Sequence, residues 1–276
     1  SKLRRRTSKM DLNAGRCADP GTPTKRRILA VFTSEGKTMT KKIVELNNRA
    51  VRLYGQGDYK SAFKLFQQAA SLRQQANTAG IDATHRLVEE NGTAVAPPPS
   101  SYIYQRMDFD EGMHAFDGTE SVNVEDNPQT VAATLLFNSG QAKRSMEDFE
   151  GALRCYERAL MVAKPSVTLS GVSSIIISIL QNMGQLMYRM GNLTGAISAY
   201  KSALTNTIAL RGEEDITVGV TFNCLGVLYY HKSSEESETA MRYFQEALKI
   251  QIAVLGSDHE QVATTLNNLG RVHVQR

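Results

Sequence analysis

One pattern of apolar positions occurs four times along the chain and has the spacing of a helix. Each copy places an aromatic residue or Leu, an Ala, an aromatic residue and a second Ala at steps of three, four and three residues. Such steps bring side chains to one stripe of an α-helix, where Ala allows close approach and the ring fills the gap. We therefore predict four helices that pack through this stripe. The copies are Tyr59, Ala62, Phe66 and Ala69; Phe149, Ala152, Tyr156 and Ala159; Leu193, Ala196, Tyr200 and Ala203; and, without a leading residue, Ala240, Phe244 and Ala247.

A second periodic apolar segment precedes each of these helices and carries a glycine. The glycines are Gly140, Gly184 and Gly226; Ala50 takes this place in the first unit, and a further segment contains Gly270. Glycine inside a helix costs about 1 kcal/mol relative to Ala, so its recurrence indicates a place where two helix backbones touch and no side chain fits. Each unit is therefore predicted to be a helical hairpin.

Together these residues resemble the tetratricopeptide repeat, which combines Leu-Gly in one helix with Ala, an aromatic residue and Ala in the next. The glycines are spaced by 44, 42 and 44 residues, which is longer than the usual repeat and similar to kinesin light chains. Residues 255–263 and 266–270 resemble the connector and helix start of those proteins, with Glu260 where Pro is usual. The resemblance implies an all-α, right-handed superhelical solenoid of helical hairpins. HEAT and armadillo arrays share the period but lack the Ala-aromatic-Ala helix.

The repeats divide the chain into four predicted parts. These are a disordered basic arm (1–40), a first helical hairpin (41–80), a Pro-containing insertion or decayed repeat (81–127), and an array of three repeats followed by the first helix of another (128–276). We expect Asn127 to cap the helix that Pro128 opens.

The segment 81–127 is compatible with two interpretations. Pro97, Pro98 and Pro99 end any helix there, and residues 102–105 and 111–116 have the composition of a short β-hairpin. Alternatively, Phe109, Gly112 and Phe116 copy the spacing of a repeat helix. We favour an irregular insertion.

The N-terminal residues are strongly basic. Residues 1–43 carry twelve Lys or Arg and three Asp or Glu, a net charge of +9, so the rest of this chain of net charge +4 carries −5. Such an arm could tether the protein to nucleic acid or to an acidic membrane. No aromatic residue interleaves the arginines, which disfavours nucleic acid because bases have nothing to stack on. Ser8 and Thr22 lie in short motifs typical of phosphorylation sites.

The sequence contains no catalytic, cofactor or metal signature. The five His residues do not have zinc spacing, and no phosphate-binding loop is present. The cluster of Asp108, Asp110 and Glu111 is interpreted as a solvated turn, because calcium loops need further ligands. We expect no enzyme activity, no cofactor, no metal and no transmembrane segment. Three well-separated cysteines favour a reducing, cytoplasmic location.

The function predicted from the repeats is binding of a peptide segment of another protein. If the apolar stripe of each glycine-containing helix faces its partner helix, the residues offset from it face the concave side of the array. Asn and Gln amides can form hydrogen bonds with the backbone of an extended peptide, and Arg can pair with carboxylate side chains of that peptide. An acidic partner is therefore favoured. We also expect self-association through the C-terminal end, because the chain stops after the first helix of a unit and repeat arrays need capped ends. The predicted contact residues are Asn138, Gln141, Arg144, Gln181, Asn182, Gln185, Arg189, Asn223, Tyr230, Asn267, Asn268 and Arg271.

Overall fold

The computed structural model describes residues 23–78, 128–163 and 174–275, and these parts are helical with no strand. The predicted all-α fold is confirmed. The helices are α1 (Pro23–Gly55), α2 (Tyr59–Thr78), α3 (Pro128–Ser145), α4 (Phe149–Ala163), α5 (Ser174–Arg189), α6 (Leu193–Arg211), α7 (Ile216–Lys232), the 3-10 turn η2 (Ser234–Glu236), α8 (Ser237–Leu255) and α9 (Glu260–Gln275).

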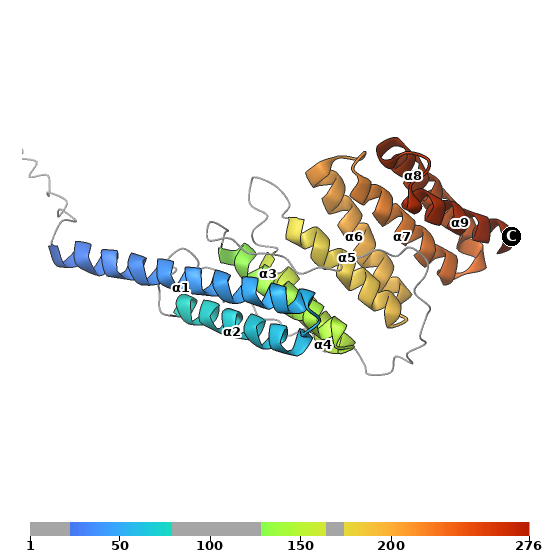
Figure 1. The fold of residues 1–276 in the computed structure, drawn as a ribbon. Coiled ribbons are helices and arrows are strands. Elements are labelled where there is room, and N and C mark those ends of the chain that lie inside the picture. Colours follow the sequence, from blue (N-terminus) through green and yellow to red (C-terminus); the bar gives the residue numbers. More distant parts are fainter. Residues whose placement is uncertain (1–22, 79–127, 164–173, 276) are drawn as a thin grey trace, which may run out of the picture.

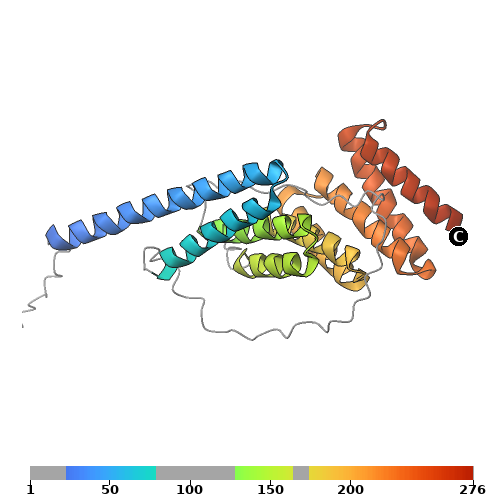
Figure 2. The same ribbon diagram turned by 60° about the horizontal axis from the view of Figure 1, so that its bottom comes forward.

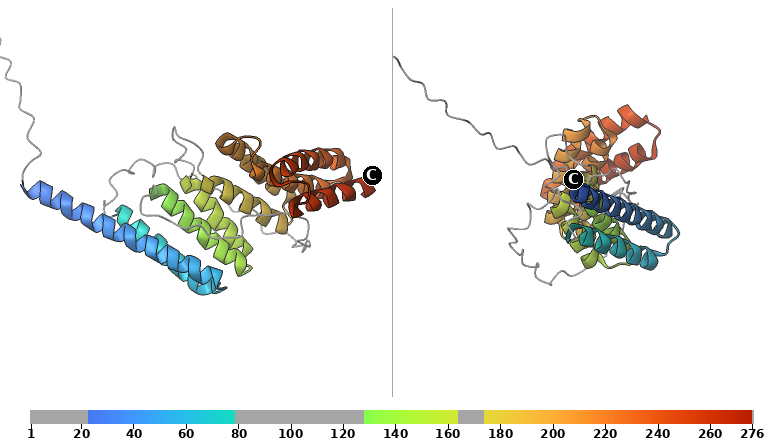
Figure 3. Two further views of the ribbon diagram at one scale, coloured as in Figure 1. Left: turned by 45° about the horizontal axis from the view of Figure 1, so that its top comes forward. Right: turned by 90° about the vertical axis from the view of Figure 1, so that its left-hand side faces the viewer.

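The helices pair as hairpins, and the hairpins follow one another along a solenoid (Figure 1). Helices α1 and α2, α3 and α4, α5 and α6, and α7 and α8 form the pairs, and each even-numbered helix also packs on the odd-numbered helix that follows it. Figures 2 and 3 show the same succession from other directions. Each hairpin thus buries one face internally and another against its neighbour, as repeat arrays do.

The first hairpin is part of the continuous array. Helix α2 packs directly on α3 although 49 residues separate Thr78 from Pro128. Ile43 and Ala69 of the first hairpin share a buried cluster with Val131 and Leu135 of α3. The predicted insertion therefore does not interrupt the stack, and both interpretations of its structure concern residues outside those described here.

Helix α1 begins earlier than the sequence indicated. The arm was predicted to be disordered through residue 40, whereas α1 starts at Pro23 and extends past α2 (Figure 1). Pro suits the first helical position, and a helix that is anchored by packing further along extends at little cost per residue. The basic segment 1–22, with Ser8 and Thr22, lies outside the described residues, as do Asn127 and the acidic cluster at 108–111.

Buried aromatic rings occupy the centre of each hairpin. Phe66, Tyr156 and Tyr200 are 0% exposed and Phe244 is 1% exposed. A Cβ atom added at Gly140 would lie 2.5 Å from the ring of Tyr156. The corresponding distance is 2.6 Å from Gly184 to the Tyr200 ring and from Gly226 to the Phe244 ring. The predicted close approach at these glycines is therefore correct, but a ring and not a second backbone fills the space.

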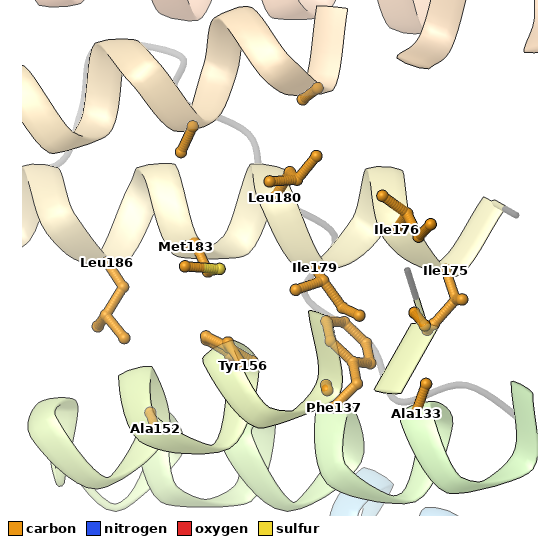
Figure 4. Packing of buried hydrophobic residues seen from close by; sticks show 14 of the residues in the cluster. Ala133, Phe137, Ala152, Tyr156, Ile175, Ile176, Ile179, Leu180, Met183 and Leu186 are labelled. Carbon is orange, nitrogen blue, oxygen red and sulfur yellow. The ribbon is translucent and has the colours of Figure 1, made fainter. Parts of the chain in front are cut away.

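The largest core cluster joins the α3–α4 hairpin to α5. Figure 4 shows Ile179, Met183 and Leu186 of α5 pointing toward Phe137 of α3 and Tyr156 of α4. The Ile-rich start of α5 adds Ile175 and Ile176 to this contact. Burial of these apolar side chains supplies the main force that stacks one hairpin on the next.

Candidate peptide-binding surface

The odd-numbered helices lie side by side and present the surface on which the predicted binding residues are found. Helix α1 contacts α3, α3 contacts α5, and α7 contacts α9. A side-chain hydrogen bond from Gln181 to Thr221 joins α5 to α7. We call this set of helices the odd-helix layer.

Hydrogen bonds between buried polar side chains cross three of the four junctions of the odd-helix layer, those between α1 and α3, α5 and α7, and α7 and α9. Asn138 Nδ2 donates to Asn47 Oδ1 over 3.0 Å between α3 and α1, and Gln181 Nε2 donates to Thr221 Oγ1 over 3.1 Å. Between α9 and α7, the Asn268 Nδ2 donates to Asn223 Oδ1 over 3.3 Å. These bonds form a polar ladder that fixes how successive repeats are rotated, because a buried amide must find a partner.

Much of the predicted contact set is buried, whether in this ladder or within a single hairpin. Asn138, Gln141 and Asn182 are 0% exposed, so no part of these side chains is available to a ligand in this structure. Gln141 accepts a hydrogen bond from the Tyr156 hydroxyl. The helical offset selects residues of the odd-helix layer, but it does not separate side chains that lie between helices from those that face outward. The nearly buried members are Gln181, Gln185, Asn223 and Asn268.

The accessible members of the predicted set are three arginines, Tyr230 and Asn267. Arg144, Arg189, Arg271 and Tyr230 are partly exposed, and Asn267 is exposed. Arg144 and Arg189 lie at the C-terminal ends of α3 and α5, and Tyr230 lies near that of α7. The structure therefore concentrates the accessible residues at one edge of the layer.

Aromatic rings hold the cations along this edge. The Arg189 guanidinium lies 4.9 Å from the Phe149 ring centroid, and that of Arg271 lies 4.9 Å from the Tyr230 ring centroid. Arg144 Nη1 donates to Gln185 Oε1 over 2.8 Å. Stacking on a ring or bonding to an amide limits the freedom of a guanidinium and leaves it further N–H donors.

His231 of α7 brings α5 and α7 into contact at this edge. The His231 ring lies 5.8 Å from Tyr188 of α5 and 5.2 Å from Tyr230 of its own helix. The sequence did not single out His231 or Phe149 for this surface, because their roles depend on rings contributed by other repeats. We call Arg144, Arg189, Tyr230, His231 and Arg271 the cation–aromatic edge.

The three central helices of the odd-helix layer carry only positive charge. Helices α3, α5 and α7 contain no Asp or Glu, and they carry Lys143, Arg144, Arg189 and Lys232. Lys143 is engaged by Asp148, and this hydrogen bond is the main reason why the pKa of the Asp148 carboxyl lies below its ordinary value. The acidic residues of the described array lie mostly in the even-numbered helices and in the turns. Lys143 and Lys232 are paired with Asp148 and Glu236 of the turns, so the arginines of the edge are the cations that would attract an anionic ligand.

Two asparagines at the same position of successive repeats are expected to differ in their effect on stability, because only Asn138 belongs to the ladder. Asn138→Leu should reduce the free energy of unfolding by about 1 to 3 kcal/mol, because Asn47 loses its buried partner. Asn182 Nδ2 donates within its own helix, to the Ser178 carbonyl over 2.8 Å, and Asn182 Oδ1 is buried without a hydrogen-bond partner among the described residues. Asn182→Leu should therefore be neutral or stabilising.

A urea titration monitored by circular dichroism gives the free energy of unfolding of both variants. An equal loss of stability in the two would show that the hydrogen bond between repeats is not what distinguishes these positions.

The described residues contain no group of His, Cys, Asp or Glu that could hold a metal ion. Among the helices described, none has the length and apolar character that a membrane span requires.

Comparison with known proteins identifies the repeat. Sequence models described as tetratricopeptide repeat match residues 46–77, 133–165 and 218–276. The α5–α6 hairpin lies between the matched segments and repeats the same contact of Gly184 with Tyr200. No curated protein sequence matches the chain.

Solved structures with this arrangement include a putative kinesin light chain. BtubC (BKLC) from P. vanneervenii superposes with a TM-score of 0.57 at 17% identity, over 92% of this chain and 85% of that one. A putative kinesin light chain from Podosopora anserina with nearly identical TPR-like repeats gives 0.55 at 12% identity, over 86% and 87% of the two chains. At these identities the likeness establishes the fold.

Proposed function

We propose that this chain, a tetratricopeptide-repeat scaffold for protein interactions that resembles kinesin light chains, binds an extended acidic segment of a partner protein along its cation–aromatic edge. The observation that carries the proposal is that Arg144, Arg189 and Arg271 lie toward the C-terminal ends of α3, α5 and α9, while α3, α5 and α7 contain no Asp or Glu. No catalytic step is part of this role.

The geometry suits a segment that runs across the repeats. The edge crosses from α3 to α5 through Arg144 and Gln185, from α5 to α7 through Tyr188 and His231, and from α7 to α9 through Tyr230 and Arg271. A chain lying across these helices meets a cation or an aromatic ring at each of them. Because the guanidiniums are already held by rings or an amide, binding a carboxylate costs less conformational entropy than it would for free side chains.

We expect an acidic peptide to bind through these arginines. The probe is a fluorescein-labelled peptide of alternating Glu and Ser residues, with a Gln and Ser peptide of the same length for comparison. Replacing Arg144, Arg189 and Arg271 together by Gln should weaken binding of the acidic peptide at least about tenfold, since charge-assisted hydrogen bonds each contribute roughly 1.5 to 3 kcal/mol. Fluorescence anisotropy measures the affinity, and circular dichroism checks the helix content of the variant.

A matched control removes the same charge from the even-numbered helices. Arg154 and Arg242 pair with carboxylates of their own helices on exposed surface, and Arg158 is exposed on α4. The triple Gln variant at these three positions should bind the acidic peptide as the parent chain does. If both triple variants weaken binding equally, overall charge and not the edge is responsible, and the proposal is wrong.

The alternative role, tethering through the basic N-terminal residues, is separable by deletion. Removing residues 1–22 leaves α1 intact, because the helix begins at Pro23. Acidic-peptide binding by the edge should survive this deletion, whereas salt-sensitive binding to phosphatidylserine vesicles should weaken, because residues 1–22 carry +4 of the +9 net charge of residues 1–43.

A further inference from the structure

Two of the three arginines of the cation–aromatic edge extend toward each other. Arg144 of α3 extends toward α5, and its Nη1 donates to Gln185 Oε1 of that helix over 2.8 Å. Arg189 of α5 extends in the opposite direction, and its guanidinium lies 4.9 Å from the ring centroid of Phe149, the first residue of α4. Both guanidiniums therefore lie where the α3–α4 hairpin meets α5.

The third guanidinium of the edge lies further along the array. Arg271 of α9 extends toward α7, where its guanidinium is 4.9 Å from the Tyr230 ring centroid. Between these two places, the rings of Tyr188 and His231 join α5 to α7, with their centroids 5.8 Å apart. The edge thus has two guanidiniums between α3 and α5, rings between α5 and α7, and one guanidinium between α7 and α9.

The packing of the odd-numbered helices sets the distance between the two cationic places. Cα atoms of α3 lie within 8 Å of Cα atoms of α5, as do those of α7 and α9, and the hydrogen bond from Gln181 to Thr221 holds α5 beside α7. Packed helix axes are about 8 to 10 Å apart, so two steps along the layer cover roughly 16 to 20 Å. An extended peptide advances about 3.3 Å per residue and crosses this distance in about five or six residues.

We propose that the acidic segment bound at this edge carries its carboxylates in a matching order: two adjacent Asp or Glu residues, an uncharged stretch, and a single Asp or Glu about six residues away. This charge register rests on the proposed function and specifies which acidic segments the edge selects. Two neighbouring carboxylates match the pair of guanidiniums between α3 and α5, because Arg pairs with carboxylates through N–H donors of fixed direction. The contact with Tyr230 holds the Arg271 guanidinium over α7, so it meets a separate carboxylate.

Three fluorescein-labelled peptides of equal length and composition test the charge register. Each contains three Glu residues, with Ser elsewhere. The clustered peptide has the three Glu consecutively, and the two spaced peptides have an adjacent pair and a third Glu six residues away, one for each chain direction. We expect one spaced peptide to bind the full chain at least about fivefold more tightly than the clustered peptide, because it forms a third charge-assisted hydrogen bond. Fluorescence anisotropy gives the affinities.

Arg271→Gln tests where the single carboxylate binds. The variant should weaken the tighter spaced peptide to the affinity of the clustered one. It should leave the clustered peptide unchanged, since three consecutive residues span about 7 Å and do not connect the two cationic places. The matched control is Arg242→Gln, which removes the same charge from the exposed surface of α8, where Arg242 pairs with Glu238 over 2.9 Å. All three affinities should be unaffected by this control.

The outcomes separate the charge register from the proposed function. Equal binding of the clustered and spaced peptides overturns the register, and so does an effect of Arg271→Gln that is the same for all three peptides or is matched by Arg242→Gln. In those cases the proposed function still stands if the triple Gln variant at Arg144, Arg189 and Arg271 loses binding of all three peptides. If the triple variant binds them as the parent chain does, the proposed function is wrong as well.

Discussion

Phe244→Ala is expected to reduce the free energy of unfolding of the α7–α8 hairpin by about 3 to 5 kcal/mol. The Phe244 ring is 1% exposed and rests on Gly226. Removing the ring leaves a cavity that the glycine on the other side cannot fill, since it has no side chain to move. Repeat arrays unfold in segments that depend on their neighbours, so the loss should appear first in α7, α8 and α9. Urea titration with circular dichroism gives the total change, and hydrogen exchange locates it.

Tyr243→Ala on the same helix is the comparison for this variant. Tyr243 is partly exposed, so removing its ring returns less area to water and should cost about 1 to 2 kcal/mol. If Tyr243→Ala cost as much as Phe244→Ala, burial against the glycine would not be the source of the larger effect.

Gly184→Leu and Gly270→Leu are expected to change stability in opposite directions. At Gly184 even a Cβ would lie 2.6 Å from the Tyr200 ring, which is fully buried and has no room to withdraw. Overpacking of this kind costs about 3 kcal/mol or more. Gly270 has the same place in its repeat with open space beside it, so Leu should stabilise α9 by roughly 0.5 to 1 kcal/mol through its better helix propensity.

The midpoint of urea unfolding tests Gly184→Leu. For Gly270→Leu, hydrogen exchange in α9 is the more sensitive measurement, because urea unfolding reports on the whole chain. Destabilisation of similar size at both positions would mean that glycine is required by the backbone. The interpretation that the ring sets the requirement would then have to be given up.

The repeat could be predicted from the sequence because its signal lies within single helices. The stripe of Ala196, Tyr200 and Ala203 depends only on the helical period, and so does the glycine ahead of it. Both were assigned to packing faces, and Tyr200 does cover Gly184 in the structure. The order in which the helices pack could also be predicted from the sequence, since consecutive repeats of an array pack on each other.

The candidate site was predicted only in part. The helical period places Asn182 and Arg189 on the same layer, and it carries no information about the neighbouring helix. In the structure Asn182 is fully buried and Arg189 stacks on Phe149 from another repeat. His231 was missed for the same reason, because its ring partner Tyr188 is 43 residues away.

Local periodicity was thus enough to specify the hairpins, their core rings and the glycines beneath them, since all of these follow from side-chain spacing along one helix. The accessible edge and the packing of α2 on α3 across residues 79–127 arise only when the repeats are stacked. Stacking sets the rotation of each repeat relative to the next, and that rotation determines which polar side chains are buried against a neighbouring helix and which stay exposed to solvent.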